Sequence, residues 1–139
     1  MGHRLGGRVL VPGSCRAEAL VLEEPLSFWG GYDQATGEII DRRHPLSGAI
    51  AAGRVLVIPG SRGSSTTSAV FLESVRLGTA PAAVIVTQAD SFLALASIVA
   101  DELYGRPVPI VQVDPADLAD VVTGQHAEVE SDGGVTIAS

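Results

Sequence analysis

Hydrophobic residues in the middle of the chain follow two patterns, short unbroken runs and longer stretches with helical spacing. The unbroken runs suit strands that are covered on both faces, and they occupy residues 55–58, 82–86 and 108–113. Between them, Ser65 to Leu77 and Phe92 to Tyr104 repeat apolar side chains at helical spacing. Each of these stretches is followed by a glycine, which predicts a helix with a glycine at its C-terminal end.

Shorter segments near both ends indicate further β structure. The predicted strands are 7–11, 17–22, 126–130 and 135–138, the last two forming a hairpin around Asp132-Gly133-Gly134. A short helix is expected from Asp114, its cap, through Val121, whereas residues 25–53 carry turn signals and predict irregular structure. The chain has no internal repeat and no low-complexity segment, so residues 1–139 are expected to form a single domain.

The order of these elements predicts the fold class. A strand–helix–strand–helix–strand core implies parallel pairing, because each crossover helix returns the next strand to the same direction. Hairpin-like β segments flank this core on both sides. The sequence therefore predicts an α/β fold, with a central, partly parallel sheet, flanking helices and additional β-hairpins.

Composition and charge narrow the possible partners. A net charge of −7 argues against nucleic acid, which requires a basic face. No apolar run approaches the roughly 20 residues that span a bilayer, so no membrane association is expected. The mean hydropathy of +0.32 is high for a small domain and suggests a surface that is buried against another protein. With no apolar leader after Met1 and a single cysteine, Cys15, a cytoplasmic protein is expected.

Residues 59–68 carry the clearest chemistry, because they join the predicted strand at 55–58 to the following helix. In α/β sheets this edge is where ligands bind. Gly60 and Gly63 allow a tight turn and a close approach to a guest molecule. The N–H groups of the first helical turn would face an anion there.

Side chains of the same segment add to this interpretation. Arg62 could hold a carboxylate through two contacts, and Ser64 and Ser65 supply hydroxyls at the capping position. A structural cap explains serine and glycine here about as well, since both are common at strand-to-helix turns. The number of hydroxyl groups in residues 61–68, and the arginine, favour a binding site. The sequence lacks the lysine of a phosphate-binding P-loop and the spacing of a nucleophile elbow.

Three other stretches are candidates with weaker signals. Residues 23–33 gather the only Trp with a Phe and a Tyr, either as a docking surface or, as we favour, as a plug at one end of the core. Residues 41–45 are expected to form a solvated turn that could face a partner or a substrate. Residues 87–91 follow a strand and begin a helix, with Asp90 or Ser91 as cap, and share the sheet edge with Ser64.

The three histidines and the cysteine are expected to have no chemical role in this chain. His3, His44 and His126 are far apart in sequence, without the spacing of metal ligands, and suit surface or packing positions. One thiol cannot hold an iron–sulfur cluster by itself.

Several of these stretches together resemble the aconitase X swivel domain, also described as the small subunit of aconitase X. The resemblance covers most of the chain and rests on residues 24–31 (EPLSFWGG), 37–45 (GEIIDRRHP), 63–65 (GSS) and 78–83 (GTAPAA). It implies a swivelling β/β/α domain whose extra β structure forms a barrel-like layer. It also implies a large partner subunit that carries the cysteine ligands of an iron–sulfur cluster, with no cofactor bound by this chain alone.

The resemblance further implies a hydro-lyase that dehydrates a small carboxylate substrate. In the bacterial relatives this substrate is cis-3-hydroxy-L-proline, which gives Δ1-pyrroline-2-carboxylate, and in the archaeal relatives it is mevalonate 5-phosphate. The family's proton-accepting serine falls on Ser64, and Ser61, Arg62, Gly63 and Ser65 are expected to bind the substrate. The first substrate is favoured because no second basic residue near Arg62 is available for a phosphate. A small-anion-binding module and a structural partner that has lost the reaction remain the alternatives.

Overall fold

The computed structural model describes residues 3–61 and 65–138 of the chain. The strands are β1 (His3–Leu5), β2 (Arg8–Val11), β3 (Cys15–Val21), β4 (Val55–Ile58), β5 (Ala83–Val86), β6 (Ile110–Gln112), β7 (His126–Val129) and β8 (Val135–Ile137). The helices are α1 (Phe28–Gly31), α2 (Ser65–Leu77), α3 (Ser91–Tyr104) and α4 (Pro115–Leu118). Among the described residues, no helix has both the length and the apolar character to cross a membrane.

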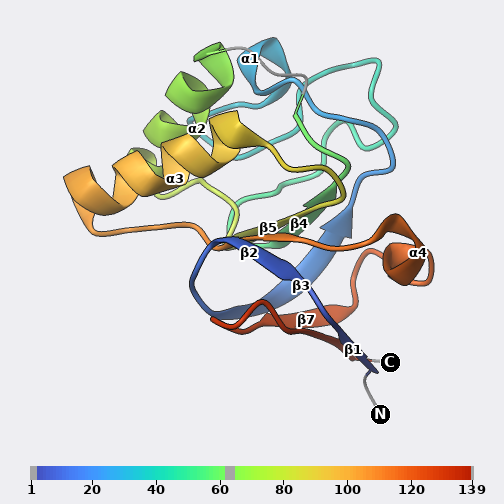
Figure 1. Cartoon of the computed structure of the whole chain (residues 1–139). Helices are drawn as coiled ribbons and strands as arrows, with labels where there is room; N and C mark the ends of the chain where they lie inside the picture. Colours follow the sequence, from blue (N-terminus) through green and yellow to red (C-terminus); the bar gives the residue numbers. More distant parts are fainter. Residues whose placement is uncertain (1–2, 62–64, 139) are drawn as a thin grey trace.

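The parallel core predicted from the sequence is confirmed. Strands β4, β5 and β6 pair in parallel in this order, with Val55 opposite Ala83 and Val84 opposite Ile110. Strand β3, which was expected in a flanking segment, adds in parallel to β4. Helices α2 and α3 make the two crossovers and lie on the same side of the sheet (Figure 1). This arrangement brings the carboxyl ends of β4 and β5 to one edge.

The β structure at the chain ends forms a second layer, partly as expected. The hairpin of β7 and β8 is confirmed, and β1 adds to β8. The prediction of a hairpin-like segment at the N-terminal end is wrong, because β2 and β3 do not pair with each other. Instead, β2 pairs with β6, and β3 pairs with β7 and β4. The reason lies in β3, whose first half, Cys15–Glu18, pairs with β7, while Ala19–Val21 pairs with β4. One long strand therefore joins both layers and leaves no edge for β2.

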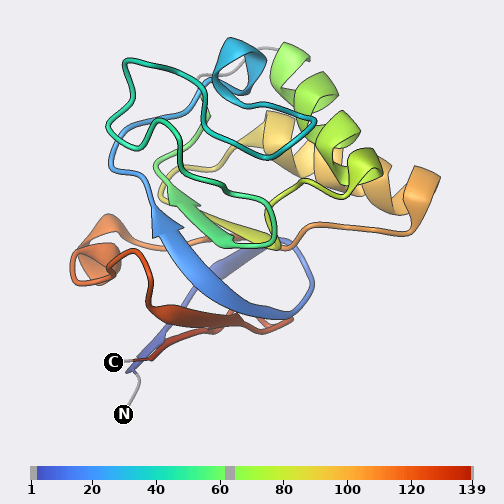
Figure 2. The ribbon, with the colours of Figure 1, turned by 180° about the vertical axis from the view of Figure 1, so that it is seen from behind.

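The core is divided into two clusters by the central sheet. Leu56 and Ile58 of β4 face the cluster beneath the helices, whereas Val55 and Val57 face the cluster beneath β7, β8 and β1. This alternation follows from the two-residue repeat of a strand and explains why β4 is apolar throughout. Figure 1 and Figure 2, which view the molecule from front and back, show three layers. The helices cover one face of the parallel strands, and the antiparallel strands cover the other face. The β/β/α architecture expected for this chain is thus confirmed.

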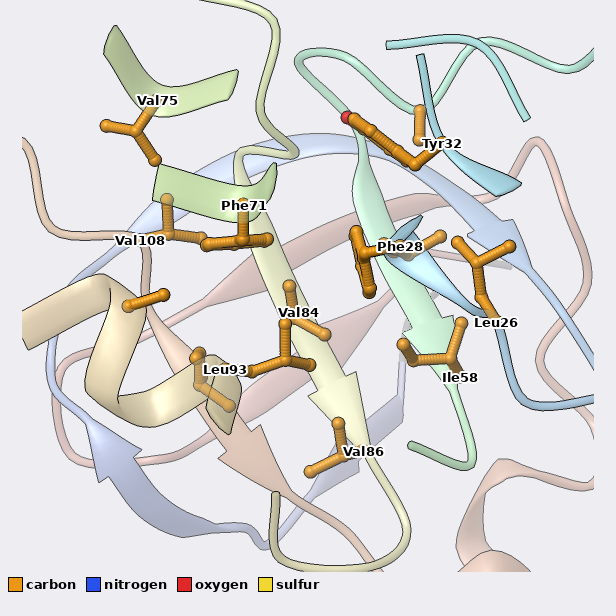
Figure 3. Packing of buried hydrophobic residues seen from close by; sticks show 14 of the residues in the cluster. Leu26, Phe28, Tyr32, Ile58, Phe71, Val75, Val84, Val86, Leu93 and Val108 are labelled. Carbon is orange, nitrogen blue, oxygen red and sulfur yellow. The ribbon is translucent and has the colours of Figure 1, made fainter. Parts of the chain in front are cut away.

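The aromatic stretch after β3 belongs to the core rather than to a docking surface. Phe28 of the one-turn helix α1 is fully buried, and its ring lies 5.2 Å from that of Tyr32 and 5.6 Å from that of Phe71, measured between centroids. Figure 3 shows these rings above Ile58 and Val84 of the sheet. The Tyr32 hydroxyl donates a hydrogen bond of 2.7 Å to the carbonyl of Thr79. The interpretation as a plug is confirmed for Phe28, and the Trp29 side chain lies outside the described part.

A close approach at Gly7 joins the two ends of the sheet. The strand order runs from β1 to β2, although these strands are separated only by Gly6 and Gly7, so the sheet must curl back on itself. A Cβ atom added at Gly7 would lie 2.2 Å from Cγ1 of Val111 and 2.6 Å from the carbonyl oxygen of Gly133. Only glycine fits at this contact between Gly7, Val111 and Gly133. The contact closes the β layers into a barrel-like arrangement.

We expect Gly7→Ala to lower the free energy of unfolding by at least about 2 kcal/mol, because the new methyl group overlaps backbone as well as side-chain atoms. Chemical denaturation of both proteins measures this loss. Gly6→Ala is the matched control, since a Cβ at Gly6 meets nothing within 4 Å. Equal stability of the two variants would contradict the proposed joint.

Candidate active site

Two loops meet at the carboxyl edge of β4 and β5. The backbone N–H of Gln88 donates to the carbonyl of Pro59 at 3.1 Å, and the Thr87 hydroxyl donates to the same carbonyl at 3.3 Å. The N–H of Ser61 donates to Oδ2 of Asp90 at 2.7 Å. The prediction that residues 87–91 share this edge with the segment after β4 is confirmed for the residues described.

Asp90 fixes both loops through its two carboxylate oxygens. Oδ1 accepts hydrogen bonds from the N–H groups of Phe92 (3.1 Å) and Leu93 (3.2 Å) and so caps α3. Oδ2 accepts from the N–H and from the hydroxyl of Ser61. The sequence left the cap open between Asp90 and Ser91, and the carboxylate provides it. A hollow of about 260 Å³ lies here, lined by Gly60, Ser61 and residues 88–92.

The predicted site residues fall mostly beyond what the structure describes. Arg62, Gly63 and Ser64 lie outside the described residues, and so does the side chain of Ser65. Helix α2 begins at Ser65, as predicted, so these residues connect Ser61 to the first turn of α2. The described ends of this connection are Ser61, which is held by two hydrogen bonds to Asp90, and the first turn of α2, in which Thr66 is exposed and Thr67 is buried.

Some of the hydroxyl groups that suggested a binding site have structural tasks. The Ser68 hydroxyl donates to the carbonyl of Phe92 at 2.9 Å and ties α2 to α3. Thr67 is buried, with 1% of its surface exposed. The abundance of hydroxyl groups in residues 61–68 is therefore weaker support for a ligand site than the sequence indicated.

A second hollow, of about 430 Å³, is built from the two segments around α1. Its lining comprises Glu24, Pro25, Ser27, Gly30, Gly31, Asp41, Arg43 and His44. It adjoins the first site, because Leu26 forms a parallel bridge to Ser61 and its N–H donates to the carbonyl of Gly60 at 3.3 Å. The sequence analysis assigned no pocket to these residues, which are separated by the loop 32–40.

The turn at residues 41–45 is solvated as expected at Arg42, Arg43 and Pro45, and only His44 is buried. Oδ1 of Asp41 accepts from the N–H of Arg43 at 3.0 Å, and Nδ1 of His44 accepts from the N–H of Leu46 at 3.1 Å. His44 is 7% exposed and packs inward, whereas Arg42 and Arg43 are exposed. The packing position predicted for His44 is confirmed, as is the surface position of His126, while the His3 side chain lies outside the described part.

Cys15 is unsuited to metal or nucleophilic chemistry. It lies half-buried in β3, where burial raises the pKa of its thiol, and a backbone hydrogen bond involving Val129 offsets this only in part. A protonated thiol is a poor ligand and a poor nucleophile. Among residues 3–61 and 65–138, no group of three His, Cys, Asp or Glu side chains could hold a metal ion. The described residues therefore do not fit an iron–sulfur cluster.

We expect Asp90→Ala to lower the free energy of unfolding by about 2–3 kcal/mol, because it removes a helix cap and the acceptor of Ser61 together. Asp114→Ala is the matched control. Asp114 accepts one cap bond, from the N–H of Ala116, and its loss is expected to cost about 1 kcal/mol. Urea denaturation followed by circular dichroism measures both losses, and equal losses would contradict the double role of Asp90.

Comparison with known proteins identifies similar sequences along nearly the whole chain. The family model described as the aconitase X swivel domain matches residues 4–137. The cis-3-hydroxy-L-proline dehydratase of Pseudomonas aeruginosa is 52% identical over 108 residues, which cover 78% of this chain and 19% of that protein. The phosphomevalonate dehydratase small subunit of Methanothermobacter thermautotrophicus is 39% identical over 128 residues, which cover 91% and 93% of the two chains.

The fold matches that of a solved relative, whereas the length of the chain matches only some of the relatives. The crystal structure of Thermococcus kodakaraensis aconitase X in its holo-form superposes with a TM-score of 0.87 at 34% identity and covers 99% of both chains. The chain spans 19% of the length of the Pseudomonas protein and 21% of the Hypocrea jecorina protein of the same name. In sequence it is more similar to the Pseudomonas protein, and in length it is more similar to the Methanothermobacter small subunit.

Proposed function

This chain belongs to the aconitase X swivel domain family, and from this membership we propose that it is the small, swivelling part of a dehydratase. The proposed enzyme is a hydro-lyase that removes water from a hydroxy acid, with a larger partner subunit completing the active site. The observation that supports this role most directly is the junction of Ser61 with Asp90. It anchors a loop at the carboxyl edge of a parallel sheet, where ligands of α/β proteins bind.

The proposed substrate is cis-3-hydroxy-L-proline, and the product is Δ1-pyrroline-2-carboxylate. The 52% identity to the Pseudomonas dehydratase supports this choice. The second candidate is mevalonate 5-phosphate, supported by the match over 93% of the length of the Methanothermobacter small subunit. Both are hydroxy acids from which water can leave with formation of a double bond.

In the proposed reaction the oxygen of Ser64 takes the proton from the carbon next to the substrate carboxylate. The C–O bond on the adjacent carbon breaks, the departing hydroxide takes up the proton that Ser64 removed and becomes water, and the electron pair of the broken C–H bond forms a C=C double bond. With cis-3-hydroxy-L-proline this first product is an enamine, which becomes Δ1-pyrroline-2-carboxylate by moving its N–H proton to carbon. A serine oxygen is a poor base in water, so this step requires a site that excludes water and holds positive charge. The N-terminal end of α2, which begins at Ser65 and carries the positive end of the helix dipole, supports such a site.

Arg62, Gly63, Ser65 and Ser61 are assigned to the substrate carboxylate. A guanidinium group and backbone N–H groups together suit an anion and stabilise the charge that develops next to it. The Ser61 hydroxyl donates to Asp90, so its oxygen is left to accept a hydrogen bond from the substrate. An iron–sulfur cluster held by the larger subunit would supply Lewis acidity for the departing hydroxyl. A cytoplasmic location, expected from the single cysteine, completes the proposal.

The test uses this chain, the large subunit produced from the same source, and their mixture. Each is incubated with cis-3-hydroxy-L-proline and, separately, with mevalonate 5-phosphate, and product is followed by chromatography. We expect dehydration in the mixture and in neither component alone. Tight carboxylate binding by this chain, without turnover in the mixture, would instead identify a binding module.

A further inference from the structure

Both hydrogen-bond donors of Ser61 are taken by Asp90. The backbone N–H of Ser61 donates to Oδ2 of Asp90 at 2.7 Å, and the hydroxyl of Ser61 donates to the same oxygen at 2.5 Å. An ionised carboxylate only accepts hydrogen bonds, so the direction of both bonds is fixed. What the hydroxyl oxygen of Ser61 can offer a ligand is therefore a lone pair and not a proton.

The carboxylate of Asp90 is itself fully used. Oδ1 accepts from the N–H groups of Phe92 and Leu93, and Oδ2 accepts the two bonds from Ser61. These bonds fill the roughly four lone-pair positions of a carboxylate. Asp90 therefore has no acceptor left for a ligand, and its influence on a ligand passes through Ser61.

The hollow at this edge of the sheet carries negative charge. Ser61 and Asp90 line it, and Asp90 is the only ionisable side chain among the described residues that do so. The other lining residues are Gly60, Gln88, Ala89, Ser91 and Phe92. A lone pair beside a negative charge attracts a hydrogen-bond donor that is positively charged. A carboxylate or phosphate oxygen at Ser61 would instead meet a lone pair and a like charge.

A donor of this kind distinguishes the two proposed substrates. cis-3-Hydroxy-L-proline carries a secondary ammonium group on the same carbon as its carboxylate, so a residue next to the carboxylate contacts is within reach of the nitrogen. Mevalonate 5-phosphate has no nitrogen, and its phosphate adds negative charge. The hydroxyl group that leaves is a donor common to both substrates, but it carries no charge.

We propose that Ser61 binds the ammonium group of an amino-acid substrate, and that Asp90 is the positioning residue that holds Ser61 as an acceptor. This inference rests on the proposed function and narrows it, because it selects a hydroxy amino acid over a phosphorylated hydroxy acid. It also narrows the role of Ser61 from the substrate carboxylate to the nitrogen next to it.

Two inhibitors that differ only at the nitrogen position test the contact with Ser61. L-Proline and cyclopentanecarboxylate share the ring size and the carboxylate, but the second has CH2 in place of the ammonium group, and neither has a hydroxyl group to lose. Their inhibition constants are measured against dehydration of cis-3-hydroxy-L-proline by the assembled complex. We expect the native complex to bind L-proline at least about tenfold more tightly than cyclopentanecarboxylate, the effect of one hydrogen bond to a charged group.

Ser61→Ala is expected to reduce this preference for L-proline to within about threefold. It removes the acceptor oxygen and retains the backbone N–H that binds Asp90. The inhibition constant of cyclopentanecarboxylate is expected to stay within about twofold of the native value, whereas the loss of a merely structural contact would weaken both inhibitors. Ser61→Thr keeps the hydroxyl group and is expected to retain the preference.

Asp90→Asn tests the positioning role. Asn keeps an acceptor for the cap of α3, but its amide N–H replaces one carboxylate oxygen, so the Ser61 oxygen receives a hydrogen bond and its own proton turns to the hollow. We expect the preference for L-proline to fall as in Ser61→Ala, with a smaller loss of stability than in Asp90→Ala. Asp114→Asn is the matched control, because Asp114 caps α4 and is not among the residues that line the hollow. It is expected to retain the preference.

The possible results separate this inference from the proposed function. If the mixture of this chain and the large subunit dehydrates neither hydroxy acid, the proposed function fails, and this inference fails with it. Dehydration of mevalonate 5-phosphate alone, or a native complex without a preference for L-proline, overturns the inference and leaves the dehydratase.

The variants decide between the possible contacts of Ser61. Equal weakening of both inhibitors by Ser61→Ala overturns the inference. So does an unchanged preference in Ser61→Ala, even with a raised KM for the substrate, because Ser61 would then contact the substrate hydroxyl. An unchanged preference in Asp90→Asn removes Asp90 from the positioning role. If Asp90→Asn does not assemble with the large subunit, Ser61→Ala decides the matter.

Discussion

Replacement of Ser64 by alanine is expected to lower the kcat of the assembled dehydratase by about two to four orders of magnitude. This is the usual contribution of a positioned group that transfers a proton in the rate-limiting step. The methyl side chain of alanine leaves no oxygen to take the proton from the substrate carbon. Because Ser64 is assigned to proton transfer rather than to carboxylate binding, the KM is expected to change much less than kcat.

Ser131→Ala provides the matched control for this experiment. Ser131 is an exposed serine in the turn between β7 and β8, in the antiparallel layer rather than at the active-site edge, and its loss is expected to leave kcat unchanged. Steady-state kinetics of the native and variant complexes with cis-3-hydroxy-L-proline measure both effects. Full turnover by Ser64→Ala, in a complex that assembles normally, would remove Ser64 from the role of base.

Phe71→Ala is expected to cost about 3–5 kcal/mol of the free energy of unfolding, the largest loss of stability that we predict for a single substitution. Phe71 is fully buried on α2, and its ring meets that of Phe28 edge-on at 5.6 Å. Removal of the ring leaves a cavity between α2, α1 and the sheet, which close packing around Phe28 and Val84 prevents from collapsing (Figure 3). Since domains of this size are stable by about 5–15 kcal/mol, the variant is expected to be close to unfolding.

Leu77→Ala tests whether this loss arises from burial. Leu77 is the last residue of the same helix and is 44% exposed, so its truncation is expected to cost less than about 1 kcal/mol. Guanidinium chloride denaturation with a fitted midpoint and slope compares the two variants. A similar midpoint for Phe71→Ala and Leu77→Ala would show that α2 does not depend on its contact with α1.

Local patterns were sufficient to predict the parallel half of the fold. The runs at β4 and β5 are apolar at every position, as strands covered on both faces must be. Both ends of helix α2 were predicted, because a glycine-rich turn precedes it and Gly78 follows it. In the structure Gly78 has a φ of 77°, which suits a glycine at the end of a helix. The helix capped by Asp114 is shorter than predicted and ends at Leu118. Its sequence lacks a stop signal at that point.

The candidate site could be predicted only in part. The pattern around Ser61 and Ser64 identified the sheet edge, since a glycine-rich turn after a buried strand is a local feature. It did not identify the partner of Ser61, because Asp90 is 29 residues further along the chain. Nor did it predict the hollow at His44, whose walls come from two segments separated by the loop 32–40.

The sequence by itself determined the secondary structure of the core and the parallel pairing of its strands, and its motifs indicated the family to which the chain belongs. The secondary structure and the pairing depend on side-chain periodicity and short turns, which act over a few residues. Only the tertiary structure decided that β3 serves both layers, that Asp90 anchors Ser61, and that His44 is buried, with no hydrogen-bond partner for its Nε2 among the described residues. The physical reason is the same in each case. Such contacts join segments that are distant in sequence, so their partners are chosen by packing and burial of the whole chain and leave no periodic signal in the residues themselves.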